Sequence, residues 1–166
     1  LHEEYLRPGM TALSVAEGEG RNAVFMAQKG LAVTALETAP SAQAKARALA
    51  QTRGVTVDFR DEDVLDRDWE RDAFDIVVGI FIQFVGPADR ARLFARMADA
   101  VAPNGVLMVH GYTPEQIAFG TGGPPCAENL YTETILRDAF PAWRVEVCRA
   151  HEAVLSEGTG HAGRSA

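Results

Sequence analysis

The chain has 166 residues, a formal net charge of −7 and 47% hydrophobic residues. This length favours a single domain over residues 1–166, and the composition excludes an intrinsically disordered chain. No apolar run approaches the roughly 20 residues that a membrane-spanning helix needs, and the first residues lack the pattern of a secretory signal. Because the 16 basic residues are scattered along an acidic chain, we expect neither nucleic-acid nor membrane binding.

Hydrophobic periodicity predicts alternating strands and helices from the start of the chain. Short apolar segments predict strands at residues 11–16, 31–37 and 55–60. Apolar residues at helical spacing predict a helix over residues 20–29, which Gly30 ends in a left-handed cap. An alanine-rich stretch predicts a second helix over residues 41–52, with Ser41 as its N-cap.

The middle of the chain continues this alternation. Residues 74–81 form the most apolar run, which indicates a central parallel strand covered on both faces. Residues 88–101 predict an amphipathic helix with Leu93, Phe94 and Met97 on its apolar face. The sequence P-N-G at residues 103–105 predicts a turn before a strand at residues 106–110.

The last third of the chain begins with a long irregular segment. Residues 112–129 contain a cluster of glycines and prolines, which is typical of a lid or a substrate loop. A helix over residues 131–140 and a strand over residues 143–149 follow. Cys126 and Cys148 form no C-x-x-C pair, so we expect free thiols, no disulfide, no metal site and a cytoplasmic location.

Strands separated by helices predict a mostly parallel α/β sheet with helices on both faces, a Rossmann-like three-layer sandwich. Ligands of such sheets bind beyond the carboxyl ends of the strands, near the point where the strand order reverses. We therefore expect the functional residues directly after residues 16, 37, 60, 81 and 110.

A glycine loop follows the first predicted strand. Gly18, Gly20 and Ala23 match the pattern G-x-G-x-x-G/A of nucleotide-binding loops, in which glycine permits a tight turn and a close approach of the ligand. A glycine-rich turn without a ligand is the alternative interpretation. The position of the loop between a strand and a helix favours ligand binding.

The charges of this loop discriminate between ligands. NAD or FAD would place a diphosphate at the helix N-terminus, close to Glu17 and Glu19. Like charges at short range in a partly desolvated site cost on the order of a few kcal/mol. S-adenosylmethionine has no phosphate and carries a sulfonium, an ammonium and one carboxylate group. Acidic side chains suit its cationic end and free backbone amides suit its carboxylate, so the loop favours this compound over a dinucleotide.

Further candidates lie at the ends of the next strands. Glu37 ends the second predicted strand, where an acidic residue can accept hydrogen bonds from both ribose hydroxyls. One of the acidic residues 61–63 is a candidate acceptor for the adenine amine. Phe81 and Ile82 are candidates for packing against adenine or substrate, with a place in the core as the alternative.

These residues resemble a known family. The sequence L-S-V-A-E-G-E-G-R-N-A at residues 13–23 resembles the first motif of class I S-adenosylmethionine-dependent methyltransferases, a hydrophobic strand followed by D-x-G-x-G-x-G. The stretch G-E-G-R-N-A, together with residues 120–124, is similar to the small tellurite-resistance and thiopurine methyltransferase-like group. Residues 33–37 resemble the second motif, residues 61–66 the third and residues 74–78 the fourth. Residues 102–105, before Val106, resemble the K-P-G-G turn, from which Asn104 and Val106 depart.

The resemblance covers residues 10–109 and implies the same Rossmann-like fold, with Glu37 at the ribose and Asp63 and Val64 at the adenine. It also implies a closing antiparallel strand that begins at residues 164–166, most of which lies beyond the sequence. The implied cofactor-binding residues lie at the strand ends and are Ala16, Glu17, Gly18, Glu19, Gly20, Arg21, Asn22, Glu37, Thr38, Asp63, Val64, Ile80 and Phe81.

Two positions depart from the first motif of this family. Its acidic residue falls on Ser14 and its first glycine falls on Ala16. Ser14 cannot supply the usual carboxylate near the amino group of the cofactor, and we hypothesise that Glu17 replaces it. On this hypothesis, E17Q weakens cofactor binding in calorimetry, and an unchanged affinity excludes Glu17 from this role.

Methyl transfer is a displacement at carbon, so the protein mainly aligns the acceptor with the methyl group and excludes water. A general base is needed only for an acceptor that is protonated at neutral pH. The catalytic residues are therefore not fixed by the sequence. Weak candidates for substrate contact, chosen by their place after strands or in the irregular segment, are Gln83, His110, Tyr112 and Tyr131.

The sequence thus predicts an S-adenosylmethionine-dependent methyltransferase that acts on a small-molecule acceptor. The oligomeric state is open and includes a homodimer. One alternative function is an NAD-dependent oxidoreductase, against which Glu17 and Glu19 argue. The other is a catalytically inactive module with the methyltransferase fold, which Ser14 and Ala16 motivate.

Overall fold

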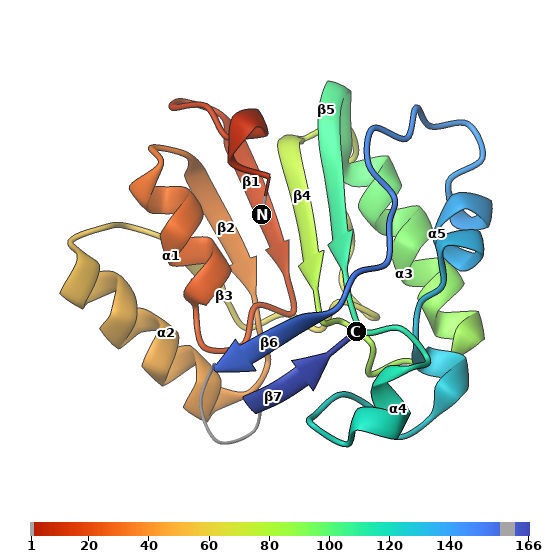
Figure 1. Cartoon of the computed structure of the whole chain (residues 1–166). Coiled ribbons are helices and arrows are strands. Elements are labelled where there is room, and N and C mark those ends of the chain that lie inside the picture. The colour runs from red at the N-terminus through yellow and green to blue at the C-terminus, as the bar shows by residue number, and fades with distance from the viewer. Residues whose placement is uncertain (1, 157–161) are drawn as a thin grey trace. The chain divides into compact units, whose positions relative to one another are not determined.

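The structure is a computed structural model that describes residues 2–156 and 162–166 (Figure 1). The chain divides into two compact units. The first unit comprises Leu1–Ile80 and Ala95–Val109, and the second comprises Phe81–Phe94 and His110–Ala166. Within the described residues, none of the helices has both the length and the apolar character that crossing a membrane requires.

The first unit contains a five-stranded sheet in the order β3-β2-β1-β4-β5. The pairs β1–β2, β1–β4 and β2–β3 are parallel, and Figure 1 shows β5 running in the same direction. The elements in chain order are the 3₁₀ turn η1 (Glu3–Tyr5), β1 (Thr11–Val15), α1 (Arg21–Gln28), β2 (Ala32–Leu36), α2 (Pro40–Arg53), β3 (Asp58–Arg60), β4 (Phe74–Ile80) and β5 (Val101–His110). The last residue of β5 belongs to the second unit, and α3 (Pro87–Ala100) contributes to both units.

The centre of the sheet is buried because β1 and β4 carry near-continuous apolar runs. Ala12, Leu13 and Val15 of β1 and Ile76 and Val77 of β4 are each at most 1% exposed. Strands of a parallel sheet that helices cover on both faces have this composition. The prediction of a central strand at residues 74–81 is therefore confirmed, as is the amphipathic helix before β5.

The strand order places a topological switch point between β1 and β4. From β1 the chain proceeds outward through β2 and β3, and then returns to add β4 and β5 on the other side. The loops that leave the carboxyl ends of β1 and β4 are thus the expected ligand position. This arrangement confirms the predicted Rossmann-like α/β fold.

Several boundaries in the first unit differ from the prediction. Ser41 is not the N-cap of α2, because the helix begins one residue earlier at Pro40 and Ala39 is its N-cap. Pro is favoured at the first helical position, since it needs no hydrogen-bond partner there. The predicted turn before β5 falls inside the strand, where Asn104 retains a left-handed backbone with φ of 65°. Strand β3 is also shorter than predicted.

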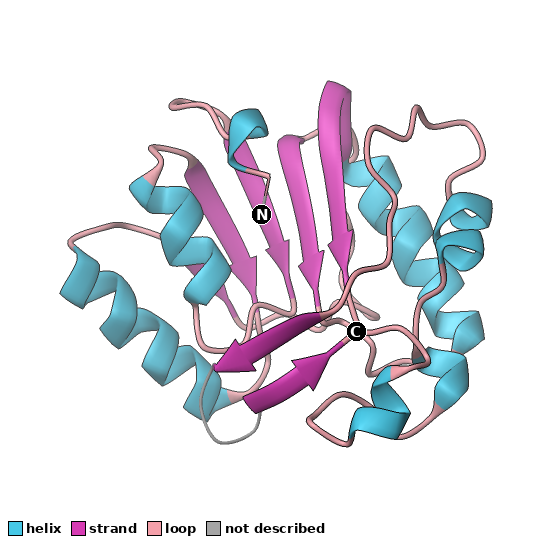
Figure 2. Cartoon of the chain, in the orientation of Figure 1, coloured by secondary structure: helices cyan, strands magenta, loops and turns pink. Residues whose placement is uncertain are grey.

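The second unit contains short elements joined by long loops, drawn in pink in Figure 2. These elements are α4 (Gln116–Phe119), the 3₁₀ turn η2 (Ala127–Asn129), α5 (Glu133–Ala139) and the antiparallel pair of β6 (Ala153–Ser156) and β7 (Ala162–Ser165). The pair β6–β7 forms a separate two-stranded sheet. Within the described residues, β7 pairs with β6 and does not close the five-stranded sheet, as the antiparallel strand expected from residue 164 onward would.

The predicted strand at residues 143–149 is wrong, and this segment is irregular. Its period-2 alternation suggested one buried face, yet Val145 and Val147 are 41% and 50% exposed. An alternating pattern becomes a strand only when a neighbouring strand supplies the hydrogen bonds of the ladder. The strand in this region instead lies at Ala153–Ser156.

Candidate functional site

The loop between β1 and α1 contains three residues with left-handed backbone. Ala16, Gly18 and Gly20 have φ of 49°, 67° and 90°. A Cβ atom at Gly20 would lie 2.7 Å from Cα of Ala46 in α2, so glycine allows the two helices to approach each other. A Cβ atom at Gly18 would meet no described atom within 4 Å. The backbone at Gly18 is therefore open to a ligand.

Glu17 points into the first unit and is 8% exposed. Its Oε1 accepts hydrogen bonds from the N–H groups of Asn22 and Ala23 at 2.9 and 3.0 Å, and its Oε2 accepts one from the Ser14 hydroxyl. Asn22 and Ala23 belong to the first turn of α1, whose N–H groups lack partners within the helix. The Glu17 carboxyl thus caps α1, and burial raises its pKa against the opposing effect of these hydrogen bonds.

The Ser14–Glu17 contact bears on the departure from the family motif at Ser14. The carboxyl group that the motif places on the strand comes here from the loop, and it reaches the strand by bonding to Ser14. Its hydrogen bonds to Ser14 and α1 are internal to the protein. The structure therefore gives Glu17 a role in shaping the loop, while a direct contact with a cofactor stays a prediction.

Glu37 follows the last residue of β2 and is half-buried. Its Oε2 accepts the Gly18 N–H at 2.8 Å, and its Oε1 accepts the Ala39 N–H at 2.8 Å. One carboxylate thus joins the glycine loop to the turn before α2. Glu19 differs from Glu37, because it is exposed and pairs with Lys45 at 2.6 Å. The hydrogen bond and the charge of Lys45 lower the pKa of Glu19.

The remaining predicted cofactor residues of the first unit lie at the ends of its strands. Asp63 is exposed, and its Oδ1 accepts the Leu65 N–H at 2.8 Å, which stabilises the turn after β3. Val64 is buried, Ile80 is half-buried at the end of β4, and Arg21 and Thr38 are exposed.

In the second unit, the structure brings together all four weak candidates for substrate contact. Gln83 is 3% exposed, accepts the Tyr112 N–H at 2.7 Å and donates to the Tyr112 carbonyl at 2.8 Å. The Phe81 ring lies 4.5 Å from the Tyr112 ring and 5.0 Å from the His110 ring, measured between centroids. Tyr131 donates its N–H to the Tyr112 carbonyl at 2.9 Å. Burial raises the pKa of the Tyr131 hydroxyl.

One polar residue in the irregular segment was not among the predicted residues. Gln116 is 1% exposed, donates to the Thr121 hydroxyl at 2.9 Å and to the Gly122 carbonyl at 3.1 Å, and accepts the Ala166 N–H at 3.0 Å. It fixes the glycine-rich part of the segment. In the sequence, Gln116 lies one helical turn before G-T-G-G, which could have marked it as a partner of this glycine-rich stretch. The sequence alone does not distinguish it from a glutamine at a surface position.

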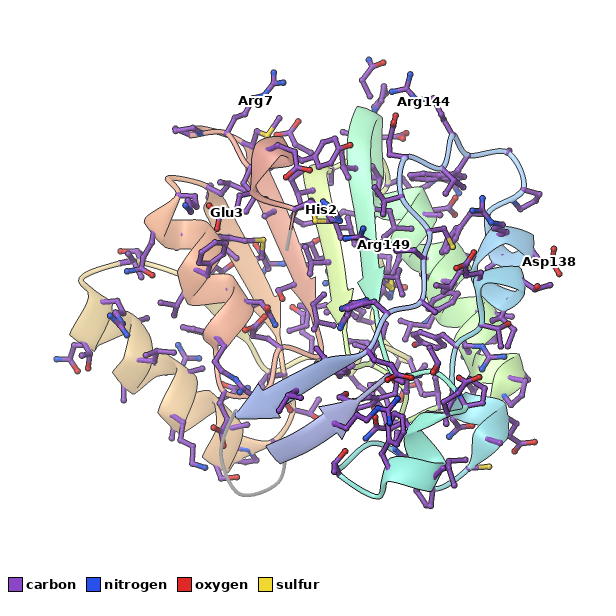
Figure 3. All side chains as sticks on the ribbon, viewed as in Figure 1. His2, Glu3, Arg7, Asp138, Arg144 and Arg149 are labelled. Carbon is purple, nitrogen blue, oxygen red and sulfur yellow. The ribbon has the colours of Figure 1, made fainter. Side chains whose placement is uncertain are left out.

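Other side chains provide no additional chemistry in the described parts of the chain. Cys126 is exposed and Cys148 half-buried, and both are free thiols. No group of three or more metal-binding side chains occurs among the described residues. Figure 3 shows Arg7 and Arg144 projecting away from the ribbon, and Arg144 pairs with Glu146 at 2.5 Å.

Comparisons with known proteins agree with this geometry. A family model described as methyltransferase domain matches residues 12–105. No curated protein matches the chain. A methyltransferase from Methanosarcina mazei, described as SAM-dependent, is 17% identical with a TM-score of 0.75, over 98% of this chain and 92% of that chain.

Two further solved structures share the fold over less of their own length. TehB from Haemophilus influenzae is 14% identical with a TM-score of 0.76, over 98% of this chain and 56% of TehB. An S-adenosylmethionine-dependent methyltransferase from Mesorhizobium loti is 21% identical with a TM-score of 0.59, over 68% of this chain and 51% of that chain. This chain thus spans about half the length of these two proteins. Because the family model covers more than half of the sequence, the chain belongs to the methyltransferase domain family.

Proposed function

We propose that this chain is an S-adenosylmethionine-dependent methyltransferase that transfers a methyl group to a small-molecule acceptor. The observation that carries the proposal is the glycine loop at the switch point, where the open backbone of Gly18 adjoins the carboxylate of Glu37. Family membership and the fold of the solved relatives indicate S-adenosylmethionine as the cofactor.

The residues of the first unit fit this cofactor. Glu37 retains acceptor capacity for ribose hydroxyls beyond its bonds to Gly18 and Ala39, because a carboxylate accepts about four hydrogen bonds. The exposed carboxylate of Asp63 is suited to the adenine amine, with the apolar Val64 beside it. Glu17 supports the loop from within through α1. Whether its charge also adds to affinity is measured by calorimetry on E17Q.

When bound, S-adenosylmethionine supplies a methyl group that its sulfonium already activates. The chain then needs to hold the acceptor in line and to keep water out. His110 is exposed at the end of β5, where it is a candidate base for an acceptor that carries a proton. An acceptor that is already anionic needs no base.

The geometry argues against the dinucleotide alternative. In a dinucleotide site, the N–H groups of this loop face a diphosphate. Here the Gly18 N–H donates to Glu37, and the Asn22 and Ala23 N–H groups donate to Glu17. A diphosphate would have to displace two carboxyl groups from these donors, whereas the sulfonium and ammonium groups of S-adenosylmethionine need no N–H donors.

Titration of the protein with S-adenosylhomocysteine, S-adenosylmethionine and NADH tests the proposal. We expect both sulfur compounds to bind and NADH not to bind. E37Q should weaken S-adenosylhomocysteine binding about ten- to a hundredfold, because it removes charge-assisted hydrogen bonds to the ribose. E3Q is the matched control, since Glu3 forms an exposed ion pair with Lys29. Tighter binding of NADH, or equal affinity of E37Q and the wild type, would contradict the proposal.

Three finer properties complete the proposal. We assign the chain to the small tellurite-resistance and thiopurine methyltransferase-like group, which the stretches G-E-G-R-N-A and G-T-G-G-P support. Residues 1–166 act as one methyltransferase domain in the cytoplasm. The acceptor is a small molecule rather than nucleic acid, in keeping with the net charge of −7.

A further inference from the structure

Phe81, which directly follows β4, has a left-handed backbone with φ of 57°. A bulky aromatic residue rarely adopts this conformation, because its Cβ crowds the backbone carbonyl. Its side chain is also 37% exposed. Residues held in such conformations gather at active sites and ligand clamps, where the surrounding structure fixes them.

Contacts within the second unit hold Phe81 in this conformation. Its N–H donates to the His110 carbonyl at 2.8 Å, and the two rings pack edge to face. The Phe81 ring also stacks on the Tyr112 ring, with 28° between the two ring planes. Tyr112 is only 3% exposed, so Phe81 is the exposed member of a stack whose other ring is buried.

Gln83 fixes Tyr112 by pairing with its backbone. The side-chain amide accepts the Tyr112 N–H and donates to the Tyr112 carbonyl, and it also donates to the Asn129 carbonyl at 3.3 Å. A Cβ atom at Gly111 would lie 2.7 Å from Cδ of Gln83 and 2.8 Å from Cδ2 of Tyr131, so glycine permits this close pairing. Both functional groups of the Gln83 amide are therefore engaged within the protein.

The same cluster contains two buried polar atoms without partners. The Tyr131 hydroxyl and Oδ1 of Asn129 have no hydrogen-bond partner within the described residues. Tyr131 packs edge to face on Phe94 and is 3% exposed. Buried polar atoms are ordinarily paired, and unpaired ones occur where water or a ligand completes the hydrogen bonding.

We propose that Phe81, stacked on the buried Tyr112, forms an aromatic wall for a small, planar methyl acceptor, and that Gln83 positions this wall through Tyr112. The inference rests on the proposed function, which requires an acceptor site beyond the strand ends. An exposed aromatic ring stacks in an offset geometry on another flat π-system, and a puckered aliphatic ring cannot form this contact. Gln83 is thereby a positioning residue, because its amide is satisfied by Tyr112 and Asn129.

The test compares the binding of 2-naphthol and decahydro-2-naphthol, which share a carbon skeleton and a hydroxyl group but differ in planarity. Each protein is first saturated with S-adenosylhomocysteine, at a concentration set by its own measured Kd. We expect the wild type to bind 2-naphthol about two- to tenfold more tightly, which corresponds to one aromatic stacking contact. F81Y should keep this preference, and F81L should lose it.

Variants of Gln83 test the positioning role. Q83L removes the amide at similar volume, so it should lose the preference for 2-naphthol and weaken the near-ultraviolet circular dichroism of the stacked rings. Q83E should recover both properties at low pH, because a protonated carboxyl group can accept the Tyr112 N–H and donate its single O–H to the Tyr112 carbonyl, which leaves only the longer bond to Asn129 unmade. A merely structural role would leave the ratio of the affinities for 2-naphthol and decahydro-2-naphthol unchanged in Q83L. Q51L on the exposed face of α2 is the matched control.

The possible outcomes separate the two proposals. Failure of S-adenosylhomocysteine to bind the wild type overturns the proposed function before any probe is added. If it binds, equal affinity for the two probes, or no binding of either, overturns the aromatic wall. An unchanged preference of F81L for 2-naphthol also overturns the aromatic wall. If Q83L does not fold, the pair F81Y and F81L decides the question.

Discussion

Ala16 has a left-handed backbone, a conformation that alanine disfavours. Its φ is 49°, at the position where the related motif has glycine. A left-handed backbone at a non-glycine residue costs about 1–2 kcal/mol, and glycine removes this cost. Glycine also gives the unfolded chain more conformational entropy, which offsets part of the stabilisation. We therefore expect A16G to raise the free energy of unfolding by about 0.5–1 kcal/mol in urea denaturation.

The helical Ala27 is the control for this change, because it lies in α1. The same substitution there, A27G, should lower the free energy of unfolding by about 1 kcal/mol, since glycine is a poor helix former. Opposite signs for the two variants identify backbone strain at Ala16. A loss of stability in both variants would contradict it.

Glu17 gives the stability of the protein a defined pH dependence. Burial raises its pKa in the folded state, so the folded protein retains this proton at pH values where the unfolded chain releases it. The stabilisation from the protonated form is complete below the unfolded pKa and is lost as the pH rises through the folded pKa. We expect the wild type to lose stability relative to E17Q as the pH increases from 4 upward.

Denaturation of both proteins from pH 4 to pH 8 measures this difference. E17Q can keep hydrogen bonds to Ser14 and to the first turn of α1, so it should fold and differ mainly in its pH slope. E17A should cost about 0.5–2 kcal/mol at pH 4, as the loss of a helix cap does, and this cost should become smaller as the pH rises. If the free energy of unfolding changes with pH in the same way for the wild type and E17Q, the buried Glu17 carboxyl does not cause the pH dependence.

Among the elements, α5 depends on one side chain at its start. Thr132 is its N-cap, and its hydroxyl accepts the Ile135 N–H at 3.1 Å. T132A should lower the free energy of unfolding by about 1 kcal/mol, whereas T132S, which keeps the hydroxyl, should have little effect. Equal losses in the two variants would assign the effect to the lost methyl group instead of the cap.

Elements whose signal is local could be predicted from the sequence, and those that need a distant partner could not. The core strands β1 and β4 have continuous apolar runs, and α3 has its apolar face at Leu93, Phe94 and Met97, all buried. The segment 143–149 has equally clear alternation but no strand pairing in the structure. At α2, Pro40 determined the helix start more strongly than Ser41, because its fixed φ suits the first helical position.

On the scale of the whole molecule, the alternation of strands and helices suffices to predict a parallel sheet and the edge at which ligands bind. The side-chain contacts at that edge join residues far apart in sequence. Gly18 meets Glu37 across 19 positions, and Gln83 meets Tyr112 across 29. The sequence therefore predicts which residue types gather after the strands, while their hydrogen-bond partners depend on the folded arrangement.

The anchoring of the glycine loop bears on how a ligand associates. Glu17 ties the loop to α1, Glu37 bonds to Gly18, and Gly20 packs closely against Ala46. Because the loop is already ordered without a ligand, it loses little conformational entropy when a ligand binds. Affinity should then vary among variants mainly through dissociation rates, with association remaining nearly constant.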